Sequence, residues 1–268
     1  MRVAALQMVS GTSLQANLDA AAQLLESAAA QGAELAVLPE YFCLMGHRDT
    51  DKLAFQEEVG CGPIQHFLAR SARASGLWIV AGTVPLRASD SQHVHNSSLA
   101  YSPAGQCVAR YDKIHLFRFN NGVEQFDETR VIEAGAAPVA FELASVDGHC
   151  YRVGLSICYD LRFPELYRAL QADLLLVPSA FTWTTGQAHW EVLLRARAIE
   201  NLAYVVAAAQ GGTHENNRRT WGQSLVIDPW GQVLAQQPQG AAVVVATVHA
   251  ARLKAVRQQL PALDHGVL

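Results

Sequence analysis

The chain has 268 residues, of which 50% are hydrophobic and 16% charged, and its net charge is −4. This composition excludes an intrinsically disordered chain, which combines low hydrophobicity with high net charge. An acidic chain without basic clusters also argues against nucleic acid or anionic lipid as a partner. The longest apolar runs are too short to span a membrane, and the N-terminus has too short an apolar core for a secretory signal. We therefore expect a cytoplasmic protein.

The N-terminal half of the sequence alternates between short apolar strands and helices. Residues 3–6 are predicted to form a strand and 14–31 a helix, in which Leu and Ala recur at steps of three and four residues. A second strand at 35–38 completes a β–α–β unit, which implies a parallel pair of strands with a right-handed crossover. The next predicted elements are a helix from Pro63 to about Ala74, a strand at 77–81 and a hairpin of strands 96–101 and 107–111. Residues 114–137 lack periodicity, which is typical of a functional or disordered loop.

The C-terminal half repeats the alternation and adds another hairpin. Its predicted strands are 139–143, 152–157, 174–177, 204–209, 223–227, 232–234 and 242–248, and its predicted helices are 164–171, 186–201 and 250–260. Several strands are apolar throughout, as expected when both faces of a sheet are covered. We infer an α/β fold in which two mixed sheets pack face to face with helices outside each, an α-β-β-α sandwich. No linker interrupts the chain, so we expect a single domain over residues 1–268.

The five cysteines do not suggest a disulfide framework or a metal site, because their number is odd, their spacing is irregular and no CxxC pair occurs. Cys158 is the candidate nucleophile. It ends an apolar strand and precedes a turn and a helix, a junction that can present a side chain beside exposed backbone N–H groups. The alternative for Cys158 taken alone is a buried structural thiol.

Two other residues follow predicted strands and complete a catalytic set. Glu40 comes after strand 35–38, and ligands in α/β sheets collect at such carboxyl ends. A semi-buried glutamate beside a thiol could act as a general base, although a surface glutamate is the alternative. Lys113 follows strand 107–111 and could stabilise an oxyanion, whereas its alternative is a loop lysine paired with Asp112.

These three residues and their flanking segments resemble the carbon–nitrogen hydrolase (nitrilase) superfamily from end to end. The matching segments are Leu38-Pro39-Glu40, the seven residues from Tyr111 to Phe117, and the run from Gly154 to Leu166. The segments Arg162-Phe163-Pro164-Glu165 and Trp221-Gly222-Gln223-Ser224 are similar to the Nit branch of small amidases. The resemblance implies an α-β-β-α sandwich and a Glu40–Lys113–Cys158 triad.

The resemblance also implies a second glutamate in the loop after the lysine. Glu128 fits that position, and Glu124 is an imperfect competitor. The stretch from Arg118 to Val123 departs from the pattern common in relatives, in a loop that lines the substrate entrance. The substrate contacts implied by the family are Tyr159, Arg162, Phe181 and Thr182. Arg162 could hold a substrate carboxylate, or it could pair with Asp160 or Glu165.

The implied activity is hydrolysis of the terminal amide of a small carboxylate-bearing substrate, through a cysteine thioester and with release of ammonia. Substrates of the deaminated-glutathione type are expected first. The alternatives are an ω-amidase acting on α-ketoglutaramate or succinamate, a nitrilase and an N-acyltransferase. A Cys–His thiol protease and a non-catalytic binding protein are less consistent with the sequence. No metal or organic cofactor is expected. A homodimer or larger homo-oligomer is expected through 164–171, 186–201 and the chain from Ala250 onward.

Overall fold

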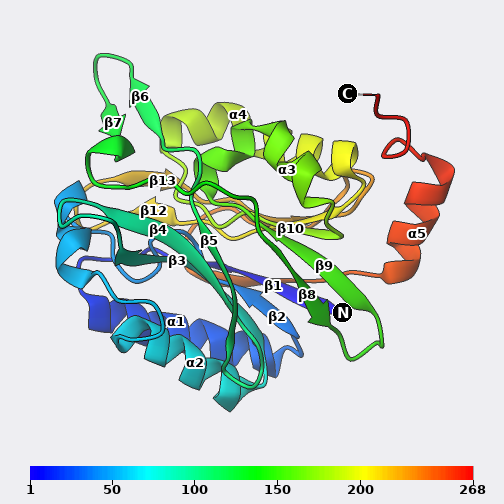
Figure 1. Ribbon diagram of the computed structural model, residues 1–268, viewed down its shortest axis with the longest axis horizontal. Coiled ribbons are helices and arrows are strands. Elements are labelled where there is room, and N and C mark those ends of the chain that lie inside the picture. Colours follow the sequence, from blue (N-terminus) through cyan, green and yellow to red (C-terminus); the bar gives the residue numbers. More distant parts are fainter. Residues whose placement is uncertain (268) are drawn as a thin grey trace.

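The computed structural model describes residues 1–267, in which two six-stranded mixed sheets lie face to face between two layers of helices (Figure 1). The first sheet has the spatial order β16 (Ala242–Thr247), β1 (Arg2–Gln7), β2 (Leu35–Val37), β3 (Trp78–Arg87), β4 (Val94–Tyr101) and β5 (Cys107–Asp112). The second has the order β15 (Val233–Gln237), β14 (Ser224–Ile227), β11 (Tyr204–Ala207), β10 (Leu174–Leu176), β9 (Cys150–Leu155) and β8 (Ala140–Ala144). The α-β-β-α sandwich predicted from the sequence is confirmed.

The first sheet is apolar on both faces because each face has its own partner. In β1, Val3 and Ala5 belong to the cluster between the two sheets, whereas Ala4 and Leu6 belong to the cluster beneath the helices. Those helices are α1 (Leu14–Ala30) and α2 (Pro63–Ser75). The parallel pairing of β1 with β2 is the β–α–β unit that the sequence predicted. Ser13 caps α1 by accepting a hydrogen bond from the Ala16 N–H.

The outer face of the second sheet is covered by α3 (Pro164–Leu170) and α4 (Trp183–Asn201). Trp190 of α4 is fully buried in that core, and its indole N–H donates to the Gln223 carbonyl at 2.8 Å. Helix α4 begins three residues before the predicted start, because the Thr182 hydroxyl caps it. The last helix, α5 (Ala250–Gln259), lies at one end of the sandwich (Figure 1).

Three regions carry structure that the sequence analysis did not predict. The loop at 114–137 contains a hairpin of β6 (Arg118–Asn120) and β7 (Gln125–Asp127), which projects from the molecule (Figure 1), and the 3-10 helix η2 (Glu128–Arg130). A second short hairpin joins β12 (Gly211–Thr213) to β13 (Arg219–Trp221), and a 3-10 helix, η1, covers Asp49–Phe55. Three-residue strands are too short to show a periodic pattern, which is why they were missed.

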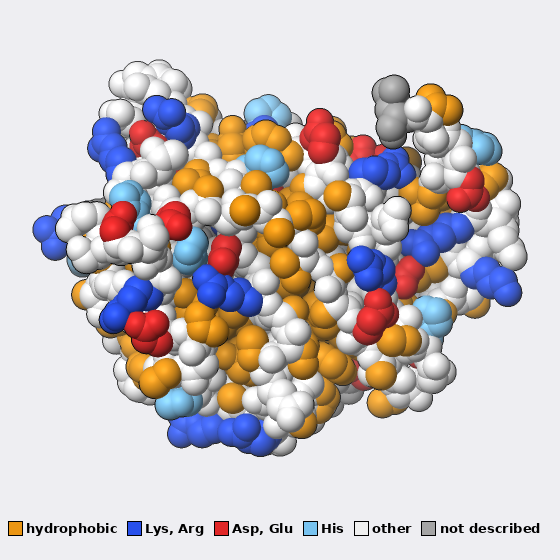
Figure 2. Space-filling model, in the orientation of Figure 1, with side chains coloured by type: hydrophobic (Ala, Val, Ile, Leu, Met, Phe, Trp, Pro, Cys, Tyr) orange, Lys and Arg blue, Asp and Glu red, His pale blue; other side chains and the backbone are white. Residues whose placement is uncertain are grey.

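On the face shown in Figure 2, no large patch carries charge of a single sign. Basic and acidic side chains are interspersed around a band of hydrophobic atoms. Within residues 1–267, no helix combines the length and the apolar character needed to cross a membrane. All five cysteines are free; Cys43 and Cys158 are buried, and the other three are exposed.

Candidate active site

The three proposed catalytic side chains come from both sheets and meet where the sheets come together. Glu40 follows β2 and Lys113 follows β5 in the first sheet, while Cys158 follows β9 in the second. Lys113 Nζ lies 2.9 Å from Glu40 Oε1, and Glu40 and Cys158 line the same pocket. Residues separated by more than a hundred positions therefore share one site, as the sequence analysis expected.

Cys158 sits on a turn whose backbone is held firmly. It has a positive φ of 50°, which L-residues adopt rarely, and it opens the 3-10 helix η3 (Cys158–Arg162). Its N–H donates to the Pro178 carbonyl at 2.9 Å. The buried Asp160 carboxylate accepts hydrogen bonds from the Ile157 N–H at 2.8 Å and the Tyr111 hydroxyl at 2.7 Å, and His115 Nδ1 lies 2.7 Å away. This network fixes the direction of the thiol.

The Glu40 carboxylate is almost completely buried, with 1% of the residue exposed, and it is held from three sides. Its Oε1 accepts hydrogen bonds from Asn96 Nδ2 at 3.0 Å and from Lys113 Nζ at 2.9 Å. Its Oε2 accepts from the Ala180 N–H at 2.9 Å. A buried carboxylate with this set of donors is preorganised to exchange a proton with a neighbouring group.

Lys113 is fully buried and is shared between two carboxylates. Its Nζ donates to Glu40 at 2.9 Å and lies 2.8 Å from both oxygens of Glu128. Burial disfavours the charged amine, but the nearby carboxylates outweigh it and raise the pKa of Lys113 above its ordinary value. The alternative pairing with Asp112 is wrong, because Asp112 binds Ser97 and Arg110 instead.

Glu128 occupies the position expected for the second glutamate. Besides Lys113, its carboxylate accepts hydrogen bonds from the Tyr41 hydroxyl at 2.9 Å and the Phe117 N–H at 2.7 Å. Burial favours the neutral acid, yet Lys113 and the Phe117 N–H lower the pKa of Glu128. The competitor Glu124 lies elsewhere, where its Oε2 accepts a hydrogen bond from the Thr184 hydroxyl at 2.7 Å.

The surroundings of the Cys158 thiol disfavour its ionised form. Burial raises the pKa of Cys158 well above its ordinary value, and the negative charge of Glu40 adds to this, although Lys113 opposes it. A neutral thiol is a weak nucleophile. A thiol that reacts in this site would therefore need a base, and the Glu40 carboxylate lines the same pocket.

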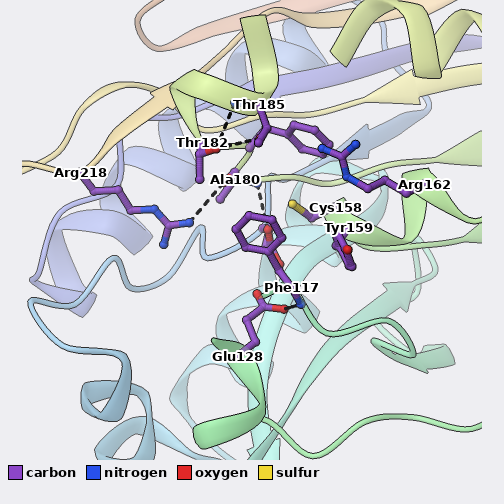
Figure 3. Close-up of a pocket in the computed structure, with 11 residues that line it drawn as sticks. Phe117, Glu128, Cys158, Tyr159, Arg162, Ala180, Thr182, Thr185 and Arg218 are labelled. Atoms are coloured by element: carbon purple, nitrogen blue, oxygen red, sulfur yellow. Dashed lines mark hydrogen bonds between the residues drawn. The ribbon is translucent and has the colours of Figure 1, made fainter. Parts of the chain in front are cut away.

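The pocket around Cys158 has an empty volume of about 300 Å³ (Figure 3). All four residues expected to contact the substrate line it: Tyr159, Arg162, Phe181 and Thr182. The alternative pairing of Arg162 with Asp160 or Glu165 is not present; one guanidinium nitrogen lies 3.3 Å from His189 Nδ1, and the guanidinium lies 5.7 Å from the ring centres of Tyr159 and Phe181.

Several residues of the site were missed by the sequence analysis. The additional pocket residues are Phe117, Ala180, Thr185 and Arg218, and the additional contacts to the glutamates come from Tyr41 and Asn96. Nothing local in the sequence distinguishes Asn96 or Arg218, because only the packing of distant segments brings them to the site. No three His, Cys, Asp or Glu side chains within residues 1–267 converge as a metal site requires.

A four-layer sandwich in which a thiol and two carboxylates line one pocket, with a buried lysine bound to both carboxylates, is typical of enzymes that attack carbon–nitrogen bonds through a cysteine. A family model for carbon-nitrogen hydrolases matches residues 2–258, so the chain belongs to the carbon–nitrogen hydrolase family. The chain is 42% identical to the deaminated glutathione amidase of Synechocystis sp. (strain PCC 6803 / GT-S), over 98% of this chain and 97% of the relative.

Solved structures agree with this assignment. The NitFhit protein of C. elegans matches with a TM-score of 0.89 and 36% identity, over 99% of this chain and 65% of the longer protein. An amidase from Nesterenkonia sp. AN1, with acrylamide added at its active site cysteine, matches with a TM-score of 0.79 and 27% identity, over 97% of this chain and 98% of that one. The present chain is accordingly an amidase of this family.

Proposed function

We propose that this amidase cleaves a small carboxylate-bearing amide through a thioester on Cys158, with Glu40 as the base, Lys113 as the oxyanion donor and Glu128 as the residue that orients water. One observation carries the proposal: a buried lysine binds, at 2.8–2.9 Å, the two glutamates that line the pocket with the thiol. This arrangement provides a base, a cation and a nucleophile without further groups.

In the first half of the reaction, Glu40 takes the proton from the Cys158 sulfur as the sulfur attacks the amide carbonyl carbon. The carbonyl oxygen gains negative charge, which Lys113 and the Tyr159 N–H stabilise. The C–N bond then breaks, Glu40 gives its proton to the departing nitrogen, and the acyl group remains on sulfur as a thioester. Glu40 ends this half as a carboxylate again.

In the second half, water replaces the amine in the pocket. Glu40 takes a proton from that water as its oxygen attacks the thioester carbon, and Glu128 holds the water in position. The C–S bond breaks and the sulfur recovers a proton from Glu40, which releases a carboxylic acid. The hydrogen bonds from Tyr41 and Phe117 to Glu128 support this role, because they fix the orientation of the carboxylate.

Deaminated glutathione is the first proposed substrate and α-ketoglutaramate or succinamate the second. The name of the Synechocystis relative supports the first, and the cationic Arg162 beside Cys158 suits a carboxylate in both cases. The two substrates differ in the leaving group. An ω-amide releases ammonia. Deaminated glutathione has no primary amide, and cleavage of its secondary amide releases cysteinylglycine, which carries a free amino group. An assay for ammonia alone would therefore miss the first substrate.

The decisive experiment measures kcat/KM for deaminated glutathione, α-ketoglutaramate and succinamate, with a nitrile and a neutral amide of similar size for comparison. Free amine is detected for the first substrate and ammonia for the others. Acidic amides are expected to react at least tenfold faster than the neutral amide. Preference for the nitrile, or equal rates on acidic and neutral amides, would contradict the proposed substrate class.

We further propose a two-fold symmetric homodimer through α3, α4 and the segment from Ala250 onward. Large apolar side chains on or beside α4 support it: Val192 is 70% exposed, Ile199 46% and Trp230 54%.

The cytoplasmic location, the absence of a cofactor and the single domain over 1–268 remain predictions. Cell fractionation, metal analysis of the active enzyme and a single cooperative unfolding transition are the measurements that test them.

A further inference from the structure

Two arginines lie on opposite sides of the pocket, although the sequence analysis singled out only one of them. Figure 3 shows Arg162 on one side and Arg218 on the other, with Cys158 between them. Arg162 belongs to the nucleophile turn, whereas Arg218 precedes β13 in a separate hairpin. Arg218 also lines the two hollows next to the pocket, so it lies where the pocket meets a wider groove.

The guanidinium of Arg218 has donors that the protein does not use. Its Nε is buried without a hydrogen-bond partner, and one terminal nitrogen donates to the Ala180 carbonyl over a long 3.4 Å. The cation also lies 5.2 Å from the centre of the Phe126 ring. A guanidinium offers five N–H donors, and a buried donor without a partner is costly. A ligand that accepts these hydrogen bonds would remove that cost.

Other arginines of the chain are paired with acidic side chains. Arg197 binds Glu200 at 2.7 Å, and Arg257 binds Asp173 at 2.7 Å. By contrast, within residues 1–267 no carboxylate lies within 4.0 Å of the guanidinium of Arg162 or Arg218. The pocket therefore contains two cations without anionic partners, while Lys113 is already bound by both glutamates.

The backbone that carries Arg218 is held in place. Its N–H donates to Asn216 Oδ1 at 2.9 Å, and its carbonyl accepts from the His214 N–H at 2.9 Å. The Asn216 side chain in turn donates to the Gly46 carbonyl at 2.6 Å. A cation on a fixed hairpin is prepared for a ligand, because little ordering remains to be done when the ligand binds.

We propose that Arg218 binds a second carboxylate of the substrate, so that the enzyme selects amides that carry one carboxylate on each side of the scissile bond. This inference rests on the proposed function and deepens it. Arg162, on the turn that bears the nucleophile, binds the carboxylate of the acyl portion. Arg218, where the pocket meets the groove, binds the more distant carboxylate of the leaving group. Bidentate contacts between arginine and carboxylate are strong, and they also fix the orientation of the carboxylate.

The test compares deaminated glutathione with its analogue in which the glycine carboxylate is a carboxamide. Arg218→Gln is expected to raise KM for deaminated glutathione by about 10- to 100-fold, the range for losing a charge-assisted hydrogen bond, with kcat nearly unchanged. On the carboxamide analogue the same variant should differ from wild type by less than about threefold. The KM of Arg218→Lys for deaminated glutathione should lie between the values for wild type and Arg218→Gln, because an ammonium keeps the charge but loses the planar fork.

Controls separate this contact from general effects of charge and folding. Arg219→Gln removes the same charge from the next residue, which lies 4.1 Å over the Trp183 ring, and it should leave both KM values near those of wild type. Arg162→Gln should raise KM for both substrates, since both retain the acyl carboxylate. Converting the glycine carboxylate to a carboxamide should by itself raise the wild-type KM by about 10- to 100-fold. This comparison uses only the wild-type enzyme, so it does not depend on the folding of any variant.

The outcomes distinguish the two levels of the proposal. Equal wild-type KM values for the two substrates, or equal losses in Arg218→Gln on both, would overturn the Arg218 inference and leave the amidase assignment intact. A wild-type enzyme that cleaves neither substrate but cleaves neutral amides would overturn the proposed substrate class itself. A loss specific to the free carboxylate, absent from Arg219→Gln, would support Arg218 as the second anion-binding residue.

Discussion

Cys158 is the residue on which the proposed chemistry depends most directly. Cys158→Ala should reduce amide hydrolysis to background, because among the described residues that line the pocket Cys158 alone carries a thiol, while thermal unfolding stays close to that of wild type. Cys61→Ala is the matched control, since Cys61 is exposed and does not line the pocket, and it should keep full activity. Turnover by a folded Cys158→Ala protein would contradict the mechanism.

Lys113 has a structural role that its sequence context did not reveal. If Lys113 acted only on the oxyanion, Lys113→Met would lose kcat without a matching change in fold. In the structure, this substitution would leave Glu40 and Glu128 buried without their cation, and breaking a buried pair costs about 3–5 kcal/mol. We therefore expect both the rate and the free energy of unfolding to fall.

A double variant separates the two effects of Lys113. Adding Glu128→Gln to Lys113→Met removes one of the uncompensated charges and should recover part of the stability in chemical denaturation, but none of the activity. Unchanged stability in Lys113→Met alone would show that the two carboxylates become protonated or hydrated at little cost. Lys113→Arg should also be poorly active, because the site has no space for a planar fork in place of a compact ammonium.

The sequence could predict the side chains that we propose to react, but not those that hold them. Glu40, Lys113 and Cys158 each follow a strand within a distinctive segment, so local pattern was enough to find them. Asn96 and Arg218 reach the site only through the packing of a neighbouring strand and a distant hairpin. Their roles depend on contacts between segments far apart in the chain, which no window of the sequence contains.

At the scale of elements, strands and helices with a clear repeat were predicted within a few residues. The prediction for β3 was too short, because the strand continues through an irregularity between Ala81 and Val84. Gly82 lies there, and a Cβ at that position would collide with the Pro39 carbonyl oxygen. The close approach of β3 to the segment before Glu40 therefore requires glycine, which also weakens the strand pattern in the sequence.

Helix α4 carries the prediction about assembly. Val192→Glu should dissociate the proposed homodimer, because a charge placed at the centre of an apolar contact is costly to bury. The measurement is sedimentation velocity at micromolar concentration, with Glu191→Gln as the control on the same helix. A wild-type protein that sediments as a monomer would contradict the proposed interface. So would a dimer that persists in Val192→Glu.

At the scale of the whole molecule, the buried ion pair links folding to pH. The pKa of Glu128 lies below its ordinary value of 4.5 in the folded state, so its contribution to stability is complete above about pH 4.5 and is lost as the pH falls through the lower value. The melting temperature of wild type should therefore exceed that of Glu128→Gln at pH 6, and the difference should shrink toward pH 3. Glu124→Gln removes a carboxylate outside the pocket and serves as the control. A difference that stays constant down to pH 3 would mean that Glu128 gains nothing from Lys113.

The order of strands in the first sheet has a consequence for synthesis of the chain. Strand β1 lies between β2 and β16, so one of its two edges is paired only when residues 242–247 have been made. At about 5–20 residues per second, the ribosome needs roughly 10–50 s to add the intervening chain. During that time the nascent protein presents an apolar strand edge, the kind of surface on which chains aggregate. Chains that terminate before Ala242 keep that edge open permanently, which makes truncated products natural targets for chaperones and proteases.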